Sequence, residues 1–132
     1  VYTILRQNRG NETTMAKKVA LSNDGGLSAT NPTYREDLTS PIVMSSIAQH
    51  PQGPLLYSGP NHSSRRVNAT IKVSQNGGRT FTPGKSIYSK RSGYSDLAVG
   101  DKGEIHCAFE CGTRDYNDAI AFITTTLDWL EG

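Results

Sequence analysis

The chain has 132 residues, a length that suits one small domain. Its 14 Lys and Arg against 12 Asp and Glu leave a formal net charge of +2, which is too small and too scattered to indicate a nucleic-acid partner. No apolar run approaches the roughly 18 residues that a membrane-spanning helix needs, and 13 Gly and 6 Pro among short β-branched and aromatic runs favour an all-β chain with many turns.

The first predicted element is the strand VYTIL at the N-terminus, which starts in mid-strand without a Met, so we expect a preceding part of the same protein. Later strands are predicted, in chain order, at 17–21, 41–49, 54–59, 69–73, 85–89, 95–100, 103–110 and from 119 onward. Turn signals such as NDGG, HPQGP, SQNGG, TPG and GDKG separate them. No segment keeps a helical period over three turns, and the closing TTTLDWLEG is either a helical turn or the end of a strand.

One pattern occurs twice, in KKVALSNDGGLSAT (17–30) and ATIKVSQNGGRTFT (69–82). Each copy has a short apolar strand, then Ser-x-Asp/Asn-Gly-Gly, then a hydroxyl residue. The roughly 52 residues between the copies suit one four-stranded blade of a β-propeller. Ser and Asp or Asn side chains can bond the backbone of a tight turn, the glycines can supply positive φ, and Phe81 is expected to pack beneath the second turn. Two unrelated Gly-rich hairpins are the alternative.

These repeats and four other segments resemble the sialidase family. SNDGGLSA (22–29) and SQNGGRTF (74–81) are similar to its Asp boxes, although Ala29, Asn76 and Phe81 depart from the pattern. Segments similar to those around the site follow in the family's order: ILRQN (4–8), GPNHSSRRVNATIKVSQNGGRTF (59–81), SGYSDLAV (92–99) and HCAFE (106–110). The resemblance implies that residues 1–132 are the C-terminal portion of a six-bladed β-propeller, about two blades, incomplete on its own.

The resemblance also assigns roles to individual residues. Tyr94 is the expected nucleophile, because a neutral phenol avoids the charge repulsion that a carboxylate nucleophile would meet at the carboxylate of sialic acid. Gly93 is expected to let the backbone bend there. Arg6 and Arg66 are expected to bind the sialate carboxylate, since a guanidinium matches its two oxygens. Glu110 is expected to orient a further arginine from outside this chain.

Two neighbouring arginines, Arg9 and Arg65, could be confused with the two assigned to the carboxylate. Asp96 shares the face of Tyr94 on a regular strand and is interpreted as a turn or backbone partner rather than an acid. The histidines His50, His62 and His106 lack metal-ligand spacing and are interpreted as structural or surface residues, so neither a metal nor a cofactor is expected.

The function implied is part of a retaining exo-α-sialidase that hydrolyses terminal sialic acid from glycans or gangliosides. A trans-sialidase and a non-catalytic propeller, structural or sialic-acid-binding, are the alternatives. In the family the acid/base Asp, the Glu that activates the tyrosine and the first carboxylate-binding Arg lie upstream. The chain alone is therefore predicted to be inactive, and its expected partner is the N-terminal part of the same propeller.

The sequence contains two cysteines and three sequons for N-glycosylation. Cys107 and Cys111 lie on one predicted strand, about 13 Å apart, which is too far for a disulfide between them. Free thiols are expected, and pairing of either cysteine with a residue outside this chain is the alternative. Sequons at Asn11, Asn61 and Asn68 permit N-glycosylation and favour a secreted or lysosomal location.

Overall fold

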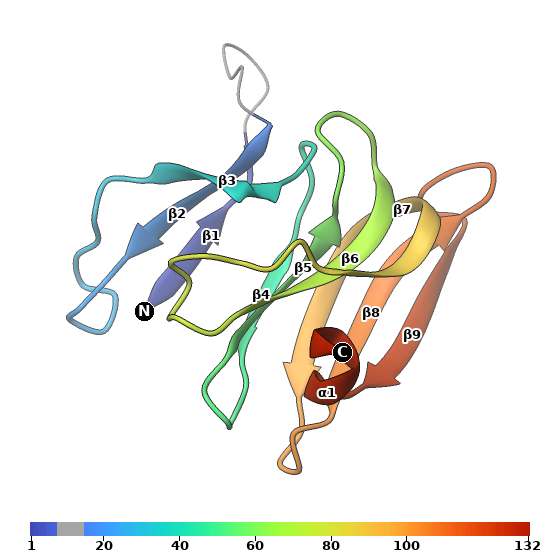
Figure 1. The fold of residues 1–132 in the computed structure, drawn as a ribbon. Helices are drawn as coiled ribbons and strands as arrows, with labels where there is room; N and C mark the ends of the chain where they lie inside the picture. Colours follow the sequence, from blue (N-terminus) through green and yellow to red (C-terminus); the bar gives the residue numbers. More distant parts are fainter. Residues whose placement is uncertain (8–14) are drawn as a thin grey trace.

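The computed structural model describes residues 1–7 and 15–132, which form two antiparallel sheets and a short C-terminal helix (Figure 1). The first sheet has the order β1 (Tyr2–Leu5), β2 (Ala16–Leu21), β3 (Thr33–Thr39). The second runs in chain order through β4 (Ser46–Gln49), β5 (Leu55–Pro60), β6 (Val67–Ser74), β7 (Lys85–Val99), β8 (Ile105–Gly112) and β9 (Ala119–Thr125), and helix α1 (Leu127–Glu131) follows. The predicted nearly all-β class is confirmed.

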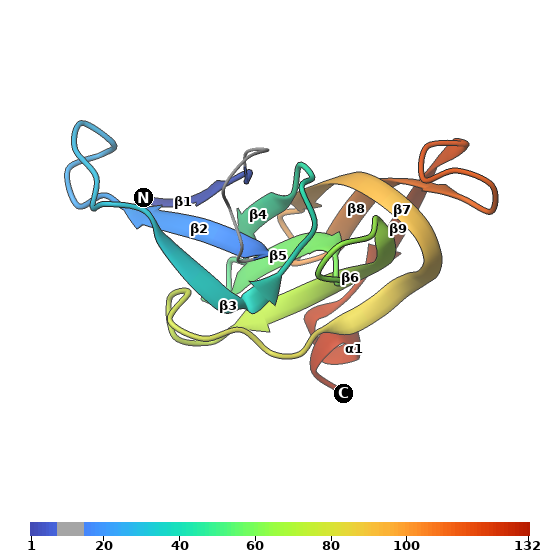
Figure 2. The same cartoon turned by 90° about the horizontal axis from the view of Figure 1, so that it is seen from above.

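Strand β7 connects the two halves of the larger sheet. Its residues 85–91 pair with β6, whereas its residues 91–99 pair with β8 on the opposite edge. The pairing with β8 shifts register between Ser92 and Ser95, as a β-bulge does, and a bulge bends the strand that carries it. Figure 2 shows the outcome, in which β7 curls round between β6 and β8 instead of lying flat.

Two apolar clusters hold these sheets together. Alternate residues of the larger sheet point into the first cluster, which comprises Leu56, Ala69, Ile71, Val73, Leu97, Ile105, Cys107 and Phe109. Leu127 and Leu130 of α1 pack against it. The second cluster lies between the sheets and comprises Val19, Leu38, Leu55, Tyr57 and Phe81. Each buried Leu, Val or Phe stabilises the fold by roughly 1.5–3 kcal/mol relative to an exposed one.

Asp37 on β3 is the main polar link between the sheets. Its carboxylate forms a salt bridge with Arg35 at 2.9 Å and accepts the backbone N–H of Phe81 at 2.8 Å. Its carbonyl oxygen accepts Lys72 Nζ of β6 at 2.7 Å. Tyr2 adds a bond from its hydroxyl to the carbonyl oxygen of Gly78 at 3.1 Å. Side chains, rather than a shared ladder, therefore fix how the first sheet sits against the second.

The two copies of the repeated pattern fold as equivalent turns. The hydroxyl of Ser22 accepts the N–H of Gly26 at 2.8 Å, and that of Ser74 accepts the N–H of Gly78 at 2.9 Å. In each turn the Asp or Asn side chain accepts the N–H of the residue four places on, at 2.9 Å. The glycines of both turns have positive φ. Phe81 is buried after the second turn, with its ring centroid 6.3 Å from that of Tyr57.

Several predicted boundaries were wrong. The strand expected at 41–49 begins only at Ser46, because the carbonyl oxygens of Ile42 and Val43 accept bonds from the side chains of Arg66 and Lys17 instead of a neighbouring strand. The segments 85–89 and 95–100 belong to one strand, β7, since the bulge bends it without breaking it. Strand β3 was not predicted, because its charged residues hide the alternation of an apolar strand. The closing segment ends β9 and then forms α1, capped by Thr126.

Candidate active site

Tyr94 occupies the β-bulge of β7. Gly93 and Tyr94 together oppose the single residue Glu110 of β8, because Ser92 pairs with Cys111 and Ser95 with Phe109. The carboxylate of Glu110 accepts the backbone N–H of Tyr94 at 2.8 Å, which satisfies a donor that the bulge removes from the ladder. The side chain of Tyr94 remains 40% exposed. The bulge thus aims a tyrosine away from the core and fixes its backbone with a carboxylate.

Gly93 is required for space rather than for an unusual backbone conformation. The strand does bend here, but Gly93 is absent from the residues with positive φ in the described part of the chain. A Cβ at this position would collide with the carboxylate of Glu110 and lie 2.7 Å from a ring carbon of Tyr116. A glycine is therefore needed at position 93 because the side chains of Glu110 and Tyr116 approach its backbone closely, and not because the backbone bends there.

We expect Gly93→Ala in the full-length protein to leave the fold intact but to displace Glu110, and with it the backbone of Tyr94. Any activity that depends on Tyr94 should fall by roughly 10–100-fold, as for a small misplacement of a reacting group. Ser92→Ala is the matched control, because the buried Ser92 hydroxyl has no hydrogen-bond partner among the described residues. Equal activity of the two variants would remove the steric role from Gly93.

Arg6 and Arg66 both lie against the Tyr94 ring. Arg6 follows β1 in the first sheet, and its Nη1 donates to the hydroxyl of Tyr94 at 3.0 Å across 88 positions of sequence. The guanidinium carbon of Arg66, which precedes β6, is 5.4 Å from the centroid of the same ring. Arg66 is also held by a bond from its Nη2 to the carbonyl oxygen of Ile42 at 3.0 Å. The structure thus brings together three residues that the sequence selected from distant motifs.

Tyr116, which the sequence did not predict as a site residue, also contacts Arg66. Its ring centroid lies 4.5 Å from the guanidinium carbon of Arg66, a cation–π distance. Tyr116 belongs to the polar turn between β8 and β9, so neither strand periodicity nor a motif singled it out. Arg65, the neighbour that could be confused with Arg66, instead contacts His62 in its own turn. Arg9 lies outside the described residues.

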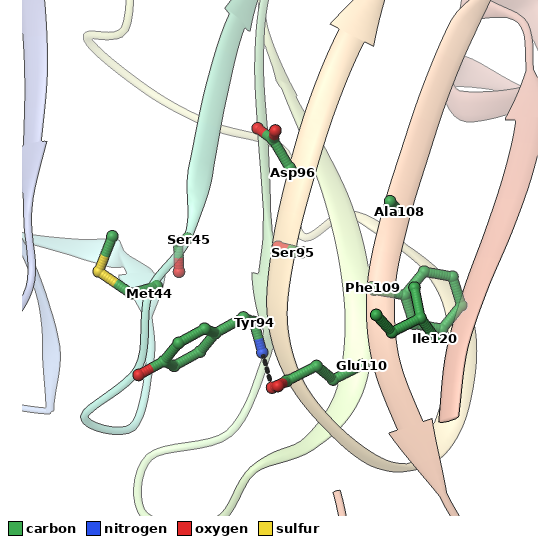
Figure 3. Close-up of a pocket in the computed structure, with 9 residues that line it drawn as sticks. All are labelled: Met44, Ser45, Tyr94, Ser95, Asp96, Ala108, Phe109, Glu110 and Ile120. Atoms are coloured by element: carbon green, nitrogen blue, oxygen red, sulfur yellow. Dashed lines mark hydrogen bonds between the residues drawn. The ribbon is translucent and has the colours of Figure 1, made fainter. Parts of the chain in front are cut away.

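An open pocket of about 590 Å³ extends from Tyr94 across β7 and β8 (Figure 3). Its lining residues are Met44, Ser45, Tyr94, Ser95, Asp96, Ala108, Phe109, Glu110 and Ile120. Figure 3 shows the Tyr94 ring directed toward the side of Met44, with Glu110 reaching back to the Tyr94 nitrogen. Apolar surface of this pocket therefore adjoins the phenol of Tyr94 and the carboxylates of Asp96 and Glu110. The guanidinium groups of Arg6 and Arg66 contact Tyr94 without lining the pocket.

A buried cation lies behind the two arginines. Lys17 of β2 is only 1% exposed, and its Nζ donates to the carbonyl oxygen of Val43 and, at 3.4 Å, to Gln7. Burial, together with the smaller effect of the positive charges of Arg6 and Arg66, lowers the pKa of Lys17 to about 8. Gln7 is itself buried and donates to the carbonyl oxygen of Ser40 at 2.9 Å. Lys17 thus adds positive charge beneath the guanidinium groups at neutral pH.

Lys17 makes the stability of the protein pH-dependent in a defined window. The unfolded chain keeps the lysine proton up to about pH 10.4, whereas the folded chain releases it near pH 8. The unfolded state therefore binds more protons between these values, and the free energy of unfolding should rise with pH there, by at most about 3 kcal/mol. Lys17→Met should abolish this rise in denaturation experiments on the full-length protein at pH 7 to 10. The exposed Lys102→Met is the control, and a Lys17→Met profile parallel to that of wild type would contradict the assignment.

The other candidates have structural partners. His50 is buried between a turn nitrogen and the carbonyl oxygen of Gly103, His62 caps its own turn, and His106 bonds Thr124 at 2.9 Å. Over residues 1–7 and 15–132 no group of His, Cys, Asp or Glu could hold a metal ion. Asp96 accepts the hydroxyl of Ser46 at 2.9 Å, so its partner is a side chain rather than the expected backbone or turn group.

The expected free thiols are confirmed, with Cys107 buried and Cys111 partly buried. Burial raises the pKa of the Cys107 thiol to about 11, so this thiol is unreactive. Asn61 and Asn68 are both partly buried, and Asn11 lies outside the described residues. In the described part of the chain, no helix combines the length and the apolar character needed to cross a membrane.

The chain is similar to sialidases in both sequence and fold. It is 34% identical over 92 residues to sialidase-3 of Bos taurus, covering 63% of this chain and 22% of the relative. It is 29% identical over 138 aligned positions to the sialidase of Micromonospora viridifaciens, covering 98% of this chain and 21% of the relative. The intramolecular trans-sialidase of Ruminococcus gnavus matches its fold with a TM-score of 0.77, at 19% identity, over 99% of this chain and 31% of that one. No family profile matches the sequence.

The sequence matches to sialidases and the sialidase structures of similar fold support a sialidase-family fragment with a propeller-like fold. The chain spans about a fifth of the length of the curated sialidases it matches. The sialidase resemblance and the propeller-like fold inferred from the sequence are therefore confirmed. The roles of Tyr94, Arg6, Arg66 and Glu110 remain predictions. In the structure Arg6 and Arg66 each contact Tyr94, and the carboxylate of Glu110 accepts the backbone N–H of Tyr94.

Proposed function

We propose that this chain carries the nucleophile and two of the carboxylate-binding residues of a retaining exo-α-sialidase. The observation that carries the proposal is the convergence on Tyr94. Arg6 donates to its hydroxyl, and Arg66 lies over its ring, although Arg6 and Tyr94 are 88 positions apart in the chain. A purely structural tyrosine has no need of one guanidinium group at its hydroxyl and a second over its ring.

In the proposed reaction, the guanidinium groups of Arg6 and Arg66 bind the sialate carboxylate by paired bonds. The oxygen of Tyr94 attacks the anomeric carbon, and the bond from that carbon to the leaving sugar oxygen breaks. Water then attacks the tyrosyl-linked carbon and releases sialic acid with retained configuration. Arg6 contributes before the substrate arrives, because its bond to the tyrosine hydroxyl holds that oxygen at the positively charged end of the site.

Two proton transfers in this scheme need groups from elsewhere in the protein. The leaving oxygen must receive a proton, and the phenol of Tyr94 must lose one. We assign these tasks to an Asp and a Glu outside this chain. Glu110 is engaged with the backbone N–H of Tyr94, and we propose that its remaining oxygen orients a third arginine. The partner of the chain is accordingly the rest of the same propeller, and the repeats at 22–29 and 74–81 are its Asp boxes.

Covalent labelling tests the proposal directly. A fluorinated sialoside that traps the glycosyl-enzyme should label the full-length protein on the peptide that contains Tyr94. The matched control is a fluorinated glucoside, which has no carboxylate and should leave no label. A label on a different residue would overturn the assignment of Tyr94, and cleavage of sialosides without any label would overturn the retaining mechanism.

The isolated chain should be inactive toward a fluorogenic sialoside. It lacks the groups assigned to the two proton transfers, and general acid–base help is typically worth about 10²–10⁴-fold. We also expect it to self-associate, because the outer edges of β1 and β9 offer unpaired backbone groups to other chains. Addition of the remaining part of the propeller should restore activity in the same assay. Hydrolysis by the isolated chain at the rate of the mixture would contradict both statements.

Transfer to a sugar instead of water is the second candidate, and the fold match to an intramolecular trans-sialidase favours keeping it. Product analysis decides between them, because transfer to another sugar yields a new sialoside, intramolecular transfer yields an anhydro sugar and hydrolysis yields free sialic acid. The sequons at Asn61 and Asn68 support the further proposal that the protein is secreted or lysosomal, which peptide mapping after glycosidase treatment would test.

A further inference from the structure

A second pocket, of about 430 Å³, is lined by Arg66 and Tyr116, and Tyr94 is not among its lining residues. We call it the basic pocket, and its lining residues are Arg65, Arg66, Val67, Lys90, Arg91, Thr113 and Tyr116. Four of these seven residues are cationic and none carries a carboxylate. Such a surface attracts negatively charged ligands, first by long-range electrostatic attraction and then by direct ion pairing.

The cations of the basic pocket are available to a ligand. Within the described ranges, none of its four cations forms a salt bridge with a carboxylate, since the one pair found there joins Arg35 and Asp37. Arg65, Lys90 and Arg91 are exposed. Asp118 lies within electrostatic range of Arg91, but its carboxylate already accepts the backbone N–H groups of two loop residues at 3.0 and 3.1 Å. Uncompensated positive charge therefore remains on the walls of the pocket.

The basic pocket adjoins the candidate active site through shared residues. The ring of Tyr116 forms part of the pocket wall, and its centroid lies 4.5 Å from the guanidinium carbon of Arg66. The same guanidinium carbon lies 5.4 Å from the centroid of Tyr94. Lys90 and Arg91 come directly before the bulge that presents Tyr94, so the strand β7 that carries the nucleophile also carries half of the positive charge. The basic pocket and the candidate active site therefore share Arg66.

We propose that the basic pocket binds a second acidic group, a carboxylate or a sulfate, of the glycan whose terminal sialate is held by Arg6 and Arg66. The inference rests on the proposed function only for the identity of the first group. The pocket selects glycans that carry two anionic groups. Its cations attract the second anionic group, in addition to the attraction that Arg6 and Arg66 exert on the terminal sialate. Arginine provides paired bonds to either a carboxylate or a sulfate, and lysine provides a mobile point charge.

The test compares three sialosides on the full-length protein: one with a neutral lactose aglycone, one with a second sialic acid and one with a sulfate ester on the lactose. At low salt, kcat/KM should be about tenfold higher for each dianionic substrate than for the neutral one. High salt should remove most of this preference, because the interacting charges are exposed to solvent. A preference for only one dianionic substrate identifies the source of the acidic group.

The double variant Lys90→Gln/Arg91→Gln should lose the preference while it keeps the activity toward the neutral sialoside. The control is Arg79→Gln/Lys102→Gln, which removes the same net charge from two turns at the other ends of β6 and β7 and should keep the preference. If the preference survives in the pocket variant, the inference is wrong and the proposed function stands. If wild type cleaves none of the three, the proposed function fails, and calorimetric binding of the sulfated glycan to wild type and to the pocket variant still decides the inference.

Discussion

Tyr94→Phe should reduce sialoside turnover by several orders of magnitude while the protein stays folded. The substitution deletes one oxygen from a ring that is 40% exposed, so little packing is lost. It removes the atom that forms the covalent bond in the proposed reaction, and no other described hydroxyl receives a bond from Arg6. Both guanidinium groups remain, so binding of a sialic-acid-like inhibitor should persist.

Steady-state kinetics together with inhibitor titration measure this result. Tyr88→Phe is the matched control, because Tyr88 lies on the same strand and uses its hydroxyl only to bond the carbonyl oxygen of Gly112, at 3.2 Å. That control should lose stability by about 1 kcal/mol and keep its turnover number. Full activity of Tyr94→Phe would exclude Tyr94 as the nucleophile.

Arg66→Lys should lower kcat/KM by about 10–100-fold, the equivalent of one or two lost charge-assisted hydrogen bonds. Lysine keeps the positive charge but cannot present two parallel N–H groups to a carboxylate. It also lacks the planar guanidinium that lies 4.5 Å from the Tyr116 ring centroid, and its single ammonium cannot donate to Ile42 while it faces the ligand. The loss should therefore appear in substrate binding as well as in turnover.

The control for this prediction is Arg65→Lys, which alters the neighbouring arginine in the same way. Arg65 is exposed and contacts His62 rather than Tyr94, so a neutral sialoside should be cleaved by that variant at the wild-type rate. The prediction is checked by comparing kcat and KM of both variants on the neutral substrate. Equal values for the two would remove Arg66 from the carboxylate site and leave Arg6 alone in that role.

Local patterns predicted the turns and the motif residues because each depends on a few adjacent side chains. The Ser and Asp or Asn of each repeat bond their own turn, and Tyr94 stands in a short motif next to a glycine. The position of Tyr116 depends instead on how the loop between β8 and β9 folds over Gly93, which no local pattern records. Burial of Lys17 depends on carbonyl groups from a segment that was itself expected to be a strand.

Strand β3 could not be predicted from the sequence because of its composition. Its sequence TYREDLT has charges at three successive positions, which reads as a surface loop. The charges are accommodated because Arg35 and Asp37 pair with each other and with groups of the second sheet. Tertiary pairing thus outweighs the weak strand propensity of acidic residues.

The absence of a shared ladder between the two sheets has a consequence for motion. Within the described residues no backbone hydrogen bond joins the first sheet to the second. Tyr94 and Glu110 belong to the second sheet and Arg66 directly precedes its strand β6, whereas Arg6 directly follows β1 of the first sheet. Small sliding of one sheet over the other would change the separation of the two guanidinium groups without opening either ladder. The backbone amide hydrogens of the two sheets should accordingly exchange with solvent as two separate cooperative units. An anion bound between the two arginines would couple the opening of the two sheets, because it contacts both.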